Sequence, residues 1–313
     1  MSRPIERALV IGSSGFLGSW IAHELAREGV EVVGTSRGGG GPVMPTLQAP
    51  ARCHAIDQAD GRMEGLLKDV DTVFFAAGVA SVPRSIEDPV SDLLANTHSV
   101  LRLLDLSRRL DRPPAFVFCS SAAVYGTALS LPMREDHPKR PVSPYGVSKL
   151  AAEEYVALYA REFGVPAAST RPFSVYGPGQ RKQVVYDLAR RIGADATSLE
   201  VAGDADVSRD FVYVTDAARA VISVAKRAPL KGEAFNVASG LETTLSALVS
   251  ALVDAAGSTI QVRFTGEVRE GDPIRWCADI AALRALGHVP EVPFADGIRR
   301  TYDWVAQQND LSA

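Results

Sequence analysis

Short apolar runs and segments of helical periodicity alternate along the first half of the chain. Apolar runs that predict strands lie at residues 8–11, 30–35, 54–57, 72–75, 115–119 and 165–170. Helices are predicted between them, at residues 20–26 and 89–109, and again from Pro144 onward. Strands that alternate with helices across short loops are typical of a parallel sheet with helices on both faces. The pattern therefore predicts an α/β fold built on a doubly wound parallel sheet.

The pattern changes after about residue 173, where the elements become shorter and turns more frequent. Strand-like segments at residues 199–204 and 208–214 are followed by predicted helices at residues 215–226, 244–257, 280–286 and 294–307. This mixture predicts a smaller α+β cap over the end of the sheet. We expect residues 1–173 to form the sheet domain. Residues 174–313 would form mainly the cap, with some segments returning to the sheet.

Composition excludes several classes of function. The chain has 313 residues, 46% of them hydrophobic and 22% charged, and its net charge of -4 provides no basic surface for nucleic acid. The three cysteines and five histidines are too scattered along the chain to predict a disulfide framework or a metal site. There is no long apolar segment typical of a signal peptide or a membrane span. We expect a soluble cytoplasmic protein without a membrane or nucleic-acid partner.

A glycine-rich turn lies between the first predicted strand and the first predicted helix. The spacing of Gly12, Gly15 and Gly18 is GxxGxxG rather than the more usual GxGxxG. Glycines at such a turn let the backbone approach a pyrophosphate, which then binds at the helix N-terminus. The turn predicts a Rossmann-type dinucleotide-binding domain at residues 1–173. The predicted cofactor contacts of this segment are Gly12, Ser14, Gly15, Phe16, Leu17 and Gly18.

The end of the second strand bears on which dinucleotide is bound. An acidic residue there would bind the ribose 2′-hydroxyl of NAD, but the chain has Ser36 and Arg37 instead. A hydroxyl and a guanidinium suit a 2′-phosphate, which favours NADP(H), with NAD as the alternative. A solvated arginine at a strand end is the simpler interpretation of Arg37. Asp57, at the end of the third strand, is expected near the adenine, and Ala76 and Ala77 allow close approach of the backbone to the cofactor.

Tyr145 and Lys149 are four residues apart in a segment that predicts a helix after Pro144. Residues at this spacing lie on one helix face, one turn apart. A free phenol has a pKa near 10, and a neighbouring ammonium is expected to lower the pKa and suit the tyrosine to general acid–base catalysis. The spacing alone more often belongs to an ordinary amphipathic helix, so the interpretation depends on the rest of the chain.

Five motifs in order carry a family resemblance. They are Gly12/Gly15/Gly18, Ser120-Ser121-Ala122-Ala123-Val124-Tyr125-Gly126, Tyr145/Lys149, Arg171-Pro172-Phe173-Ser174-Val175-Tyr176-Gly177-Pro178 and Arg209-Asp210-Phe211-Val212-Tyr213-Val214. Together they resemble the extended short-chain dehydrogenase/reductases, and within these the nucleotide-sugar epimerase/dehydratase branch. The resemblance covers nearly the whole chain. It implies an oxidoreductase that acts on a nucleotide-diphosphate sugar.

The resemblance also implies roles for individual residues. Tyr145 would be the acid/base on a sugar oxygen, Lys149 would hold the nicotinamide ribose, and Ser121 would hydrogen-bond the same sugar oxygen. Ala122 and Ala123 stand where the 4,6-dehydratases of the family have acids, which argues against a dehydratase. The expected substrate contacts are Arg84, Ser121, Ser174, Arg209, Arg269 and Arg275. For Arg275 a surface salt bridge is the equal alternative, and Ser174 replaces the usual asparagine of the family.

The resemblance leaves the reaction open between two types. Because the second strand ends in Thr35-Ser36-Arg37, we favour an NADPH-dependent 4-ketoreductase of an NDP-4-keto-(6-deoxy)hexose. The alternative is an NDP-sugar 4-epimerase with tightly bound NAD. A non-catalytic dinucleotide sensor is a remote third possibility, since sensors usually have a damaged Tyr/Lys pair and this pair is intact. The family also implies a homodimer that pairs the helix around Asn96 and the helix after Tyr145 with their copies.

Overall fold

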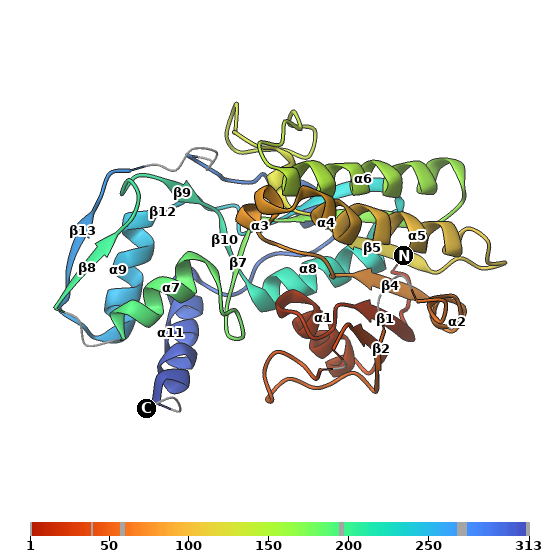
Figure 1. Cartoon of the computed structure of the whole chain (residues 1–313), viewed down its shortest axis with the longest axis horizontal. Helices are drawn as coiled ribbons and strands as arrows, with labels where there is room; N and C mark the ends of the chain where they lie inside the picture. The colour runs from red at the N-terminus through yellow and green to blue at the C-terminus, as the bar shows by residue number, and fades with distance from the viewer. Residues whose placement is uncertain (1, 39, 57–59, 194–196, 268–273, 311–313) are drawn as a thin grey trace.

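The computed structural model describes residues 2–38, 40–56, 60–193, 197–267 and 274–310. Its centre is a seven-stranded sheet in the order β11-β6-β5-β4-β1-β2-β3, and every neighbouring pair is parallel (Figure 1). The strands are β1 (Arg7–Ile11), β2 (Glu31–Ser36), β3 (Arg52–Ala55), β4 (Thr72–Phe75), β5 (Ala115–Cys119), β6 (Ala167–Pro172) and β11 (Lys231–Val237). The predicted Rossmann-type α/β fold is confirmed.

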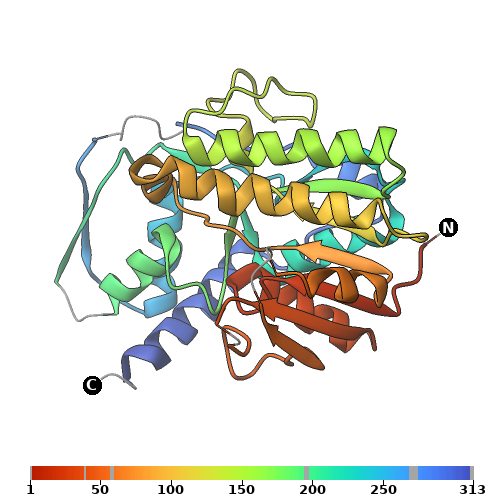
Figure 2. The same cartoon turned by 45° about the vertical axis from the view of Figure 1, so that its right-hand side comes forward.

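Helices cover both faces of the sheet because its strands are apolar on both sides. Helices α1 (Phe16–Arg27) and α8 (Val214–Arg227) pack on one face, where Val10 and Val117 lie in the core. Helices α2 (Met63–Lys68), α5 (Ser99–Ser107) and α6 (Pro144–Glu162) cover the other face, over Leu9 and Phe75. Figure 2 shows α5 and α6 lying side by side along the sheet.

The helix predicted at residues 89–109 is divided in the structure. It consists of α4 (Pro89–Leu93), a π-helical turn η1 (Leu94–His98) and α5, and a short α3 (Val82–Glu87) precedes it. The Asp88 side chain starts α4 by accepting a hydrogen bond from Ser91 N at 3.0 Å. A π turn inserts one residue into the helix, and such turns are frequent at functional sites. Asn96 lies in this turn.

The cap lies beyond the carboxyl ends of the strands and has its own core (Figure 1). It contains α7 (Gln183–Ile192), α9 (Leu245–Ala256) and α11 (Phe294–Asp310) around three two-stranded sheets. These sheets pair β7 (Ser174–Tyr176) with β10 (Phe211–Tyr213), β8 (Ser198–Val201) with β13 (Gln261–Phe264), and β9 (Ser208–Arg209) with β12 (Thr243–Thr244). A short α10 (Ala281–Ala285) lies beside β11.

The chain passes between the sheet and the cap more than once. After β7, helix α8 returns to the sheet and packs against α1, and β11 then pairs with β6. The indole Nε1 of Trp20 in α1 donates a hydrogen bond to the carbonyl oxygen of Pro178 at 3.1 Å, and Met44 packs against the cores of both parts. Within the described segments, no helix combines the length and apolarity needed to cross a membrane.

Candidate active site

The N-terminus of α6 lies against the segment that follows β5. Ser143 is the N-cap, and its hydroxyl accepts a hydrogen bond from Gly146 N at 3.2 Å. A Cβ on Gly146 would lie 2.6 Å from the carbonyl oxygen of Ala123, so only glycine permits this approach. The contact brings Tyr145, in the first turn of α6, close to Ser121 at the end of β5. The hydroxyl of Ser121 accepts a hydrogen bond from Ala123 N at 3.1 Å, which fixes the start of the short 3-10 helix η2 (Ala122–Val124).

Lys149 is buried one turn further along α6. Its Nζ donates a hydrogen bond to the carbonyl oxygen of Cys119 at 2.9 Å and lies 4.7 Å from the ring centre of Phe118. It also lies 6.0 Å from the ring centre of Tyr145, which is the one-turn relationship that the spacing predicts. Burial lowers the pKa of Lys149 to about 8, so the charge of this ammonium is sensitive to its surroundings near neutral pH.

The pKa of Tyr145 differs in direction from the sequence-based expectation. Burial raises the pKa of Tyr145 to about 12, and the hydrogen bond with Ser121 is the influence that lowers it. The ammonium of Lys149 points to the Cys119 carbonyl rather than to the phenol, so its charge does not outweigh burial in this structure. Sequence spacing shows that the two residues share a helix face, but it does not show how much water reaches the phenol.

A cavity of about 500 Å³ lies over the glycine turn and the ends of β1, β2 and β4. Seven predicted cofactor contacts line it: Gly12, Ser14, Gly15, Ser36, Arg37, Ala76 and Ala77. Gly12 has a φ of +86°, which favours glycine, and a Cβ on Gly18 would lie 2.2 Å from the Gly12 carbonyl oxygen. The turn is therefore tight for the reason predicted, and the N-terminus of α1 faces the cavity.

Further features test whether the cavity fits a dinucleotide. The hydroxyl of Ser36, which lines the cavity, is buried without a hydrogen-bond partner among the described residues, and this fits a ligand that supplies the missing partner. A Cβ on Gly78 would lie 3.6 Å from Lys149 Nζ, so the cavity wall reaches α6. Phe16 and Leu17 pack against the core instead of lining the cavity. Asp57 lies outside the described residues.

A second cavity, of about 580 Å³, lies in the cap between α7, β8, β10 and α9. Arg209 lines it together with Arg191 and Asp187 of α7. The Arg209 guanidinium donates a hydrogen bond from Nη1 to its neighbour, the carbonyl oxygen of Ser208, at 2.8 Å. Its carbon lies 5.9 Å from the ring centre of Trp276, a cation–π contact. Five of the six predicted substrate contacts lie within the described residues, and among these five Arg209 lines this cavity.

The other predicted substrate contacts are placed differently. Arg275 is exposed and forms two hydrogen bonds with the Glu242 carboxylate, at 2.6 Å and 2.7 Å, so the salt-bridge alternative describes it. Arg84 is exposed on α3 and is not among the residues lining either cavity. Ser174 is half-buried at the start of β7, where its N–H donates to the carbonyl oxygen of Asp210 at 3.0 Å. Arg269 lies outside the described residues.

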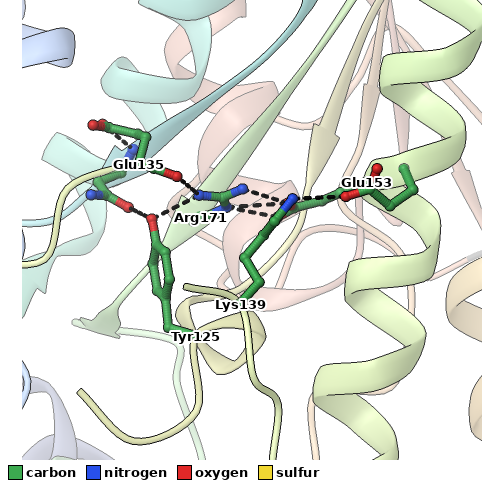
Figure 3. Close-up of polar contacts among 7 residues, drawn as sticks. Tyr125, Glu135, Lys139, Glu153 and Arg171 are labelled. Carbon is green, nitrogen blue, oxygen red and sulfur yellow. Dashed lines mark hydrogen bonds and ion pairs between the residues drawn. The ribbon is translucent and has the colours of Figure 1, made fainter. Parts of the chain in front are cut away.

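A buried network of hydrogen bonds and an ion pair, centred on Arg171, connects the segments around the site (Figure 3). The guanidinium of Arg171, in β6, donates hydrogen bonds to the Glu153 carboxylate of α6 and to the Tyr125 hydroxyl, each at 2.8 Å. Arg171 also donates to the carbonyl oxygen of Glu135, and the Tyr125 hydroxyl donates to Asn236 Oδ1 at 2.6 Å. Because Glu153 follows Lys149 by one turn and Tyr125 follows Ser121 by four residues, Arg171 ties together the two segments that carry the candidate catalytic groups.

Sequence reasoning missed a pair of buried polar side chains beside α6. Asp92 of α4 and Asn96 of η1 are both buried and both contact Ser148, which lies between Tyr145 and Lys149. Their spacing of four residues on a predicted helix was the available signal, since it places two polar side chains on one face. Nothing in the sequence alone showed that this face is buried against α6.

Comparison with known proteins identifies related chains over nearly the full length. The model of the NAD dependent epimerase/dehydratase family matches residues 8–238. A UDP-glucose 4-epimerase of Mycolicibacterium smegmatis is 31% identical over 309 residues, covering 95% of this chain and 98% of the relative. A GDP-6-deoxy-D-mannose reductase of Pseudomonas aeruginosa is 34% identical over 248 residues, covering 75% of this chain and 80% of the relative.

A solved structure agrees with these relatives. The UDP-glucuronic acid 4-epimerase of Bacillus cereus, in complex with UDP-glucuronic acid and NAD, is 27% identical and superimposes with a TM-score of 0.86. The match covers 96% of this chain and 99% of the epimerase. These relatives are two UDP-sugar 4-epimerases and a GDP-sugar reductase, and all three are enzymes.

Proposed function

This chain belongs to the NAD-dependent epimerase/dehydratase family, and from that premise we propose that it is a nucleotide-sugar 4-epimerase with tightly bound NAD. One observation carries the proposal: Ser121, Tyr145 and Lys149 are assembled beside a cavity that fits a dinucleotide. The relatives that match almost the whole chain support epimerisation over the ketoreductase reaction that the sequence favoured. A UDP-hexose is the proposed substrate class.

A 4-ketoreductase that consumes NADPH remains the second candidate. Ser36 and Arg37 line the cavity, and the Ser36 hydroxyl is buried without a partner among the described residues. A 2′-phosphate would supply oxygens for both side chains. The reductase relative of Pseudomonas aeruginosa supports the same reaction type. We place the epimerase first because the relative of Mycolicibacterium smegmatis and the structural relative of Bacillus cereus, which match nearly the whole chain, are epimerases, and the latter is in complex with NAD.

The proposed mechanism assigns proton handling to the protein. The glycine turn at Gly12 and Gly15 would hold the pyrophosphate of the dinucleotide, whose nicotinamide would supply the acceptor and then the donor of a hydride at C4 of the sugar. Tyr145 takes the proton from the C4 hydroxyl and later returns it, so the overall reaction involves no net oxidation. Ser121 hydrogen-bonds the same oxygen and stabilises its charge, and the Lys149 ammonium favours the phenolate and holds the cofactor ribose.

The residues after Ser121 restrict the chemistry to this exchange. Ala122 is fully buried and Ala123 is half-buried, and neither side chain can carry a proton. Elimination of water from the sugar would need such a group, so we propose that the enzyme does not dehydrate its substrate. For the nucleotide, we propose that the cap cavity holds the diphosphate end, with Arg209 as its contact.

We also propose a homodimer that pairs the outer faces of α4–α5 and α6. Apolar side chains are exposed there, including Val90 at 64%, Leu94 at 51% and Val147 at 53%. Exposed apolar side chains gathered on adjacent helices are typical of a surface that another chain covers. A cytoplasmic location remains a prediction from the sequence.

The decisive experiment begins with the purified protein as it is isolated. Heat denaturation should release NAD in near-stoichiometric amount, measured by chromatography. The intact protein should interconvert UDP-glucose and UDP-galactose, or the corresponding UDP-hexuronates, without added cofactor. An empty protein that instead oxidises added NADPH with a GDP- or dTDP-linked 4-keto-6-deoxyhexose would replace the epimerase with the reductase. Absence of both activities with all of these sugars would contradict the proposed function.

A further inference from the structure

A buried carboxylate contacts α6 at Ser148, which lies between the candidate catalytic residues Tyr145 and Lys149. Asp92 of α4 is 3% exposed. Its Oδ2 accepts a hydrogen bond from the Ser148 hydroxyl at 2.6 Å, and its Oδ1 accepts one from Asn96 Nδ2 at 2.9 Å. The distance to Ser148 is in the range of a charge-assisted hydrogen bond. The carboxylate is therefore held firmly at the turn of α6 that carries Tyr145 and Lys149.

The contacts around Ser148 join α6 to the wall of the cofactor cavity. Thr97 of η1 donates to the Ser148 carbonyl oxygen at 2.7 Å. Asn96 Oδ1 accepts from Val79 N at 3.3 Å, and Val79 lines the cavity. Ser148 itself is 2% exposed. The π turn η1 thus places two side-chain contacts on Ser148, from Asn96 and Thr97, and Asp92 of α4 adds a third that is charged.

Asp92 has no arginine or lysine partner among the ion pairs of the described residues, unlike the other buried carboxylate near the pair, Glu153, which binds Arg171. A buried charge without an opposite charge is costly. Lys149 is a buried cation of the same site, and its Nζ binds a main-chain oxygen rather than a carboxylate. A Cβ on Gly78 would lie 2.3 Å from Asn96 Oδ1 and 3.6 Å from Lys149 Nζ, so the ammonium lies beside the amide that binds Asp92. The two buried groups of opposite charge are electrostatically coupled, and Asp92 favours the charged form of Lys149.

We propose that Asp92 is a positioning residue of the reaction, whose buried carboxylate, held by Ser148 and Asn96, is the counter-charge of the Lys149 ammonium. It acts in two ways: it fixes the turn of α6 that carries the pair, and it keeps Lys149 charged in a site from which water is excluded. The inference rests on the proposed roles of Tyr145 and Lys149, and it is independent of which sugar is bound.

Other titratable groups near Tyr145 and Lys149 are either paired or exposed to water, apart from Cys119. Those that act on Lys149 besides Asp92 are Cys119 of β5 and Glu153 of α6, the latter paired with Arg171 of β6. The charged side chains of α3 and of the start of α4 (Arg84, Glu87 and Asp88) and His98 of η1 are exposed to water. On α5, Arg108 pairs with Asp105 and stacks on Phe163, at the far end of α6. Asp92 is thus a buried carboxylate beside Tyr145 and Lys149 that has no arginine or lysine partner among the ion pairs of the described residues.

The test uses Asp92→Asn, which keeps the size of the side chain and removes its charge. The titration of Lys149 is followed by NMR of protein labelled with 13C at the lysine ε-carbons, with the signal assigned from its loss in Lys149→Arg. A carboxylate favours the ammonium, so its removal should lower the pKa of Lys149. The measurement needs no substrate, so it can fail independently of the proposed function.

The kcat–pH profile provides the second readout. Asp92 raises the pKa of both Tyr145 and Lys149. Asp92→Asn should therefore move to lower pH both limbs of the profile, the one set by ionisation of Tyr145 and the one set by ionisation of Lys149. A role limited to packing would reduce kcat without moving either limb. Asp88→Asn, an identical change at an exposed carboxylate four residues earlier, is the matched control and should leave the profile and the Lys149 titration unchanged.

Two more variants guard against misfolding of Asp92→Asn. Asp92→Ser also removes the charge and should produce the same shift, whereas Asp92→Glu retains the charge and should restore the wild-type titration of Lys149. A Lys149 signal that titrates at the wild-type pH in either neutral variant, in protein with wild-type circular dichroism, would overturn the proposal. An equal shift in Asp92→Glu would do so as well, because the charge would then be irrelevant.

Discussion

Lys149 Nζ lies 2.9 Å from the carbonyl oxygen of Cys119, so α6 is bound to the last residue of β5. Ser121 follows Cys119 by two residues, and Tyr145 precedes Lys149 by one helical turn. This hydrogen bond therefore adds to the Gly146–Ala123 contact and the Arg171 network in holding together the segments that supply the hydroxyl, the phenol and the ammonium.

Replacement of the phenol tests proton transfer. Tyr145→Phe should lower kcat by about 10²–10⁴-fold, because a general acid–base group contributes on this order. The content of bound dinucleotide should stay near that of the wild type, since the hydroxyl and not the ring is removed. Tyr155→Phe, on the exposed side of the same helix, is the control and should have full activity. Unchanged turnover of Tyr145→Phe would refute the assignment.

Ser121 predicts a change in pH dependence. Burial raises the pKa of Tyr145 to about 12, and the Ser121 hydrogen bond lowers it. Ser121→Ala removes the lowering influence, so the pKa of Tyr145 should rise further and the alkaline-rising limb of kcat should move to higher pH. We also expect a fall in kcat on the order of 100-fold, as for loss of one donor to a developing oxyanion. A limb that moves to lower pH would contradict the geometry.

Replacement of Arg37 tests which of the two dinucleotides the protein prefers. If its guanidinium binds a 2′-phosphate, Arg37→Ala should weaken NADPH binding relative to NADH by roughly tenfold or more, equal to about 1.4 kcal/mol. Arg52→Ala is a suitable control, because Arg52 is exposed on the neighbouring strand and pairs with Glu31. Equal effects on both cofactors, measured by fluorescence titration, would identify Arg37 as a solvated side chain and favour NAD.

The buried ion pair between Glu153 and Arg171 predicts that the adjacent glutamates Glu153 and Glu154 contribute unequally to the free energy of unfolding. Glu153 and Arg171 are 4% and 3% exposed, and Glu153→Gln leaves the arginine without its partner charge. We expect a loss of about 3–5 kcal/mol in the free energy of unfolding. Glu154→Gln breaks an exposed pair with Lys139 and should cost under about 1 kcal/mol. Urea unfolding of the two variants measures the difference, and equal losses would contradict it.

Two arginines of the cap should differ in substrate binding. Arg209 lines the cap cavity, so Arg209→Ala should raise KM for the nucleotide sugar by roughly tenfold or more, with a smaller change in kcat. Arg275 is occupied by Glu242, and Arg275→Ala should leave KM within about twofold of the wild type, since an exposed pair contributes little. A large KM effect of Arg275→Ala together with a normal Arg209→Ala would reverse the assignment.

Much of the sheet was predictable because its strands are short apolar runs. The predicted bounds of β4 and β5 agree with the structure, and those of β1 differ by one residue. Strand β11 was missed because Lys231–Val237 is apolar mainly at its end, as suits a strand at the sheet edge. The π turn in Leu94–His98 was also missed, because a single inserted residue barely disturbs helical periodicity.

The candidate site was predictable where spacing decides it. Gly12, Gly15 and Gly18 form a tight turn, and Tyr145 and Lys149 share a face of α6. The sign of the Tyr145 pKa shift was not predictable, because burial depends on residues distant in sequence. The partner of Arg275 was left open for the same reason: Glu242 is 33 residues away, and their contact depends on the fold of the cap.

The repeated passage of the chain between sheet and cap has a consequence for how such a protein can change. A break after residue 173 would remove α8 and β11, leaving β6 as an unpaired edge and one face of the sheet without a helix that covers it. Neither half would then bury its apolar surface alone. Recombination could not exchange the cap between enzymes as a separable cassette, and new substrate preferences would have to arise by substitutions within a continuous chain.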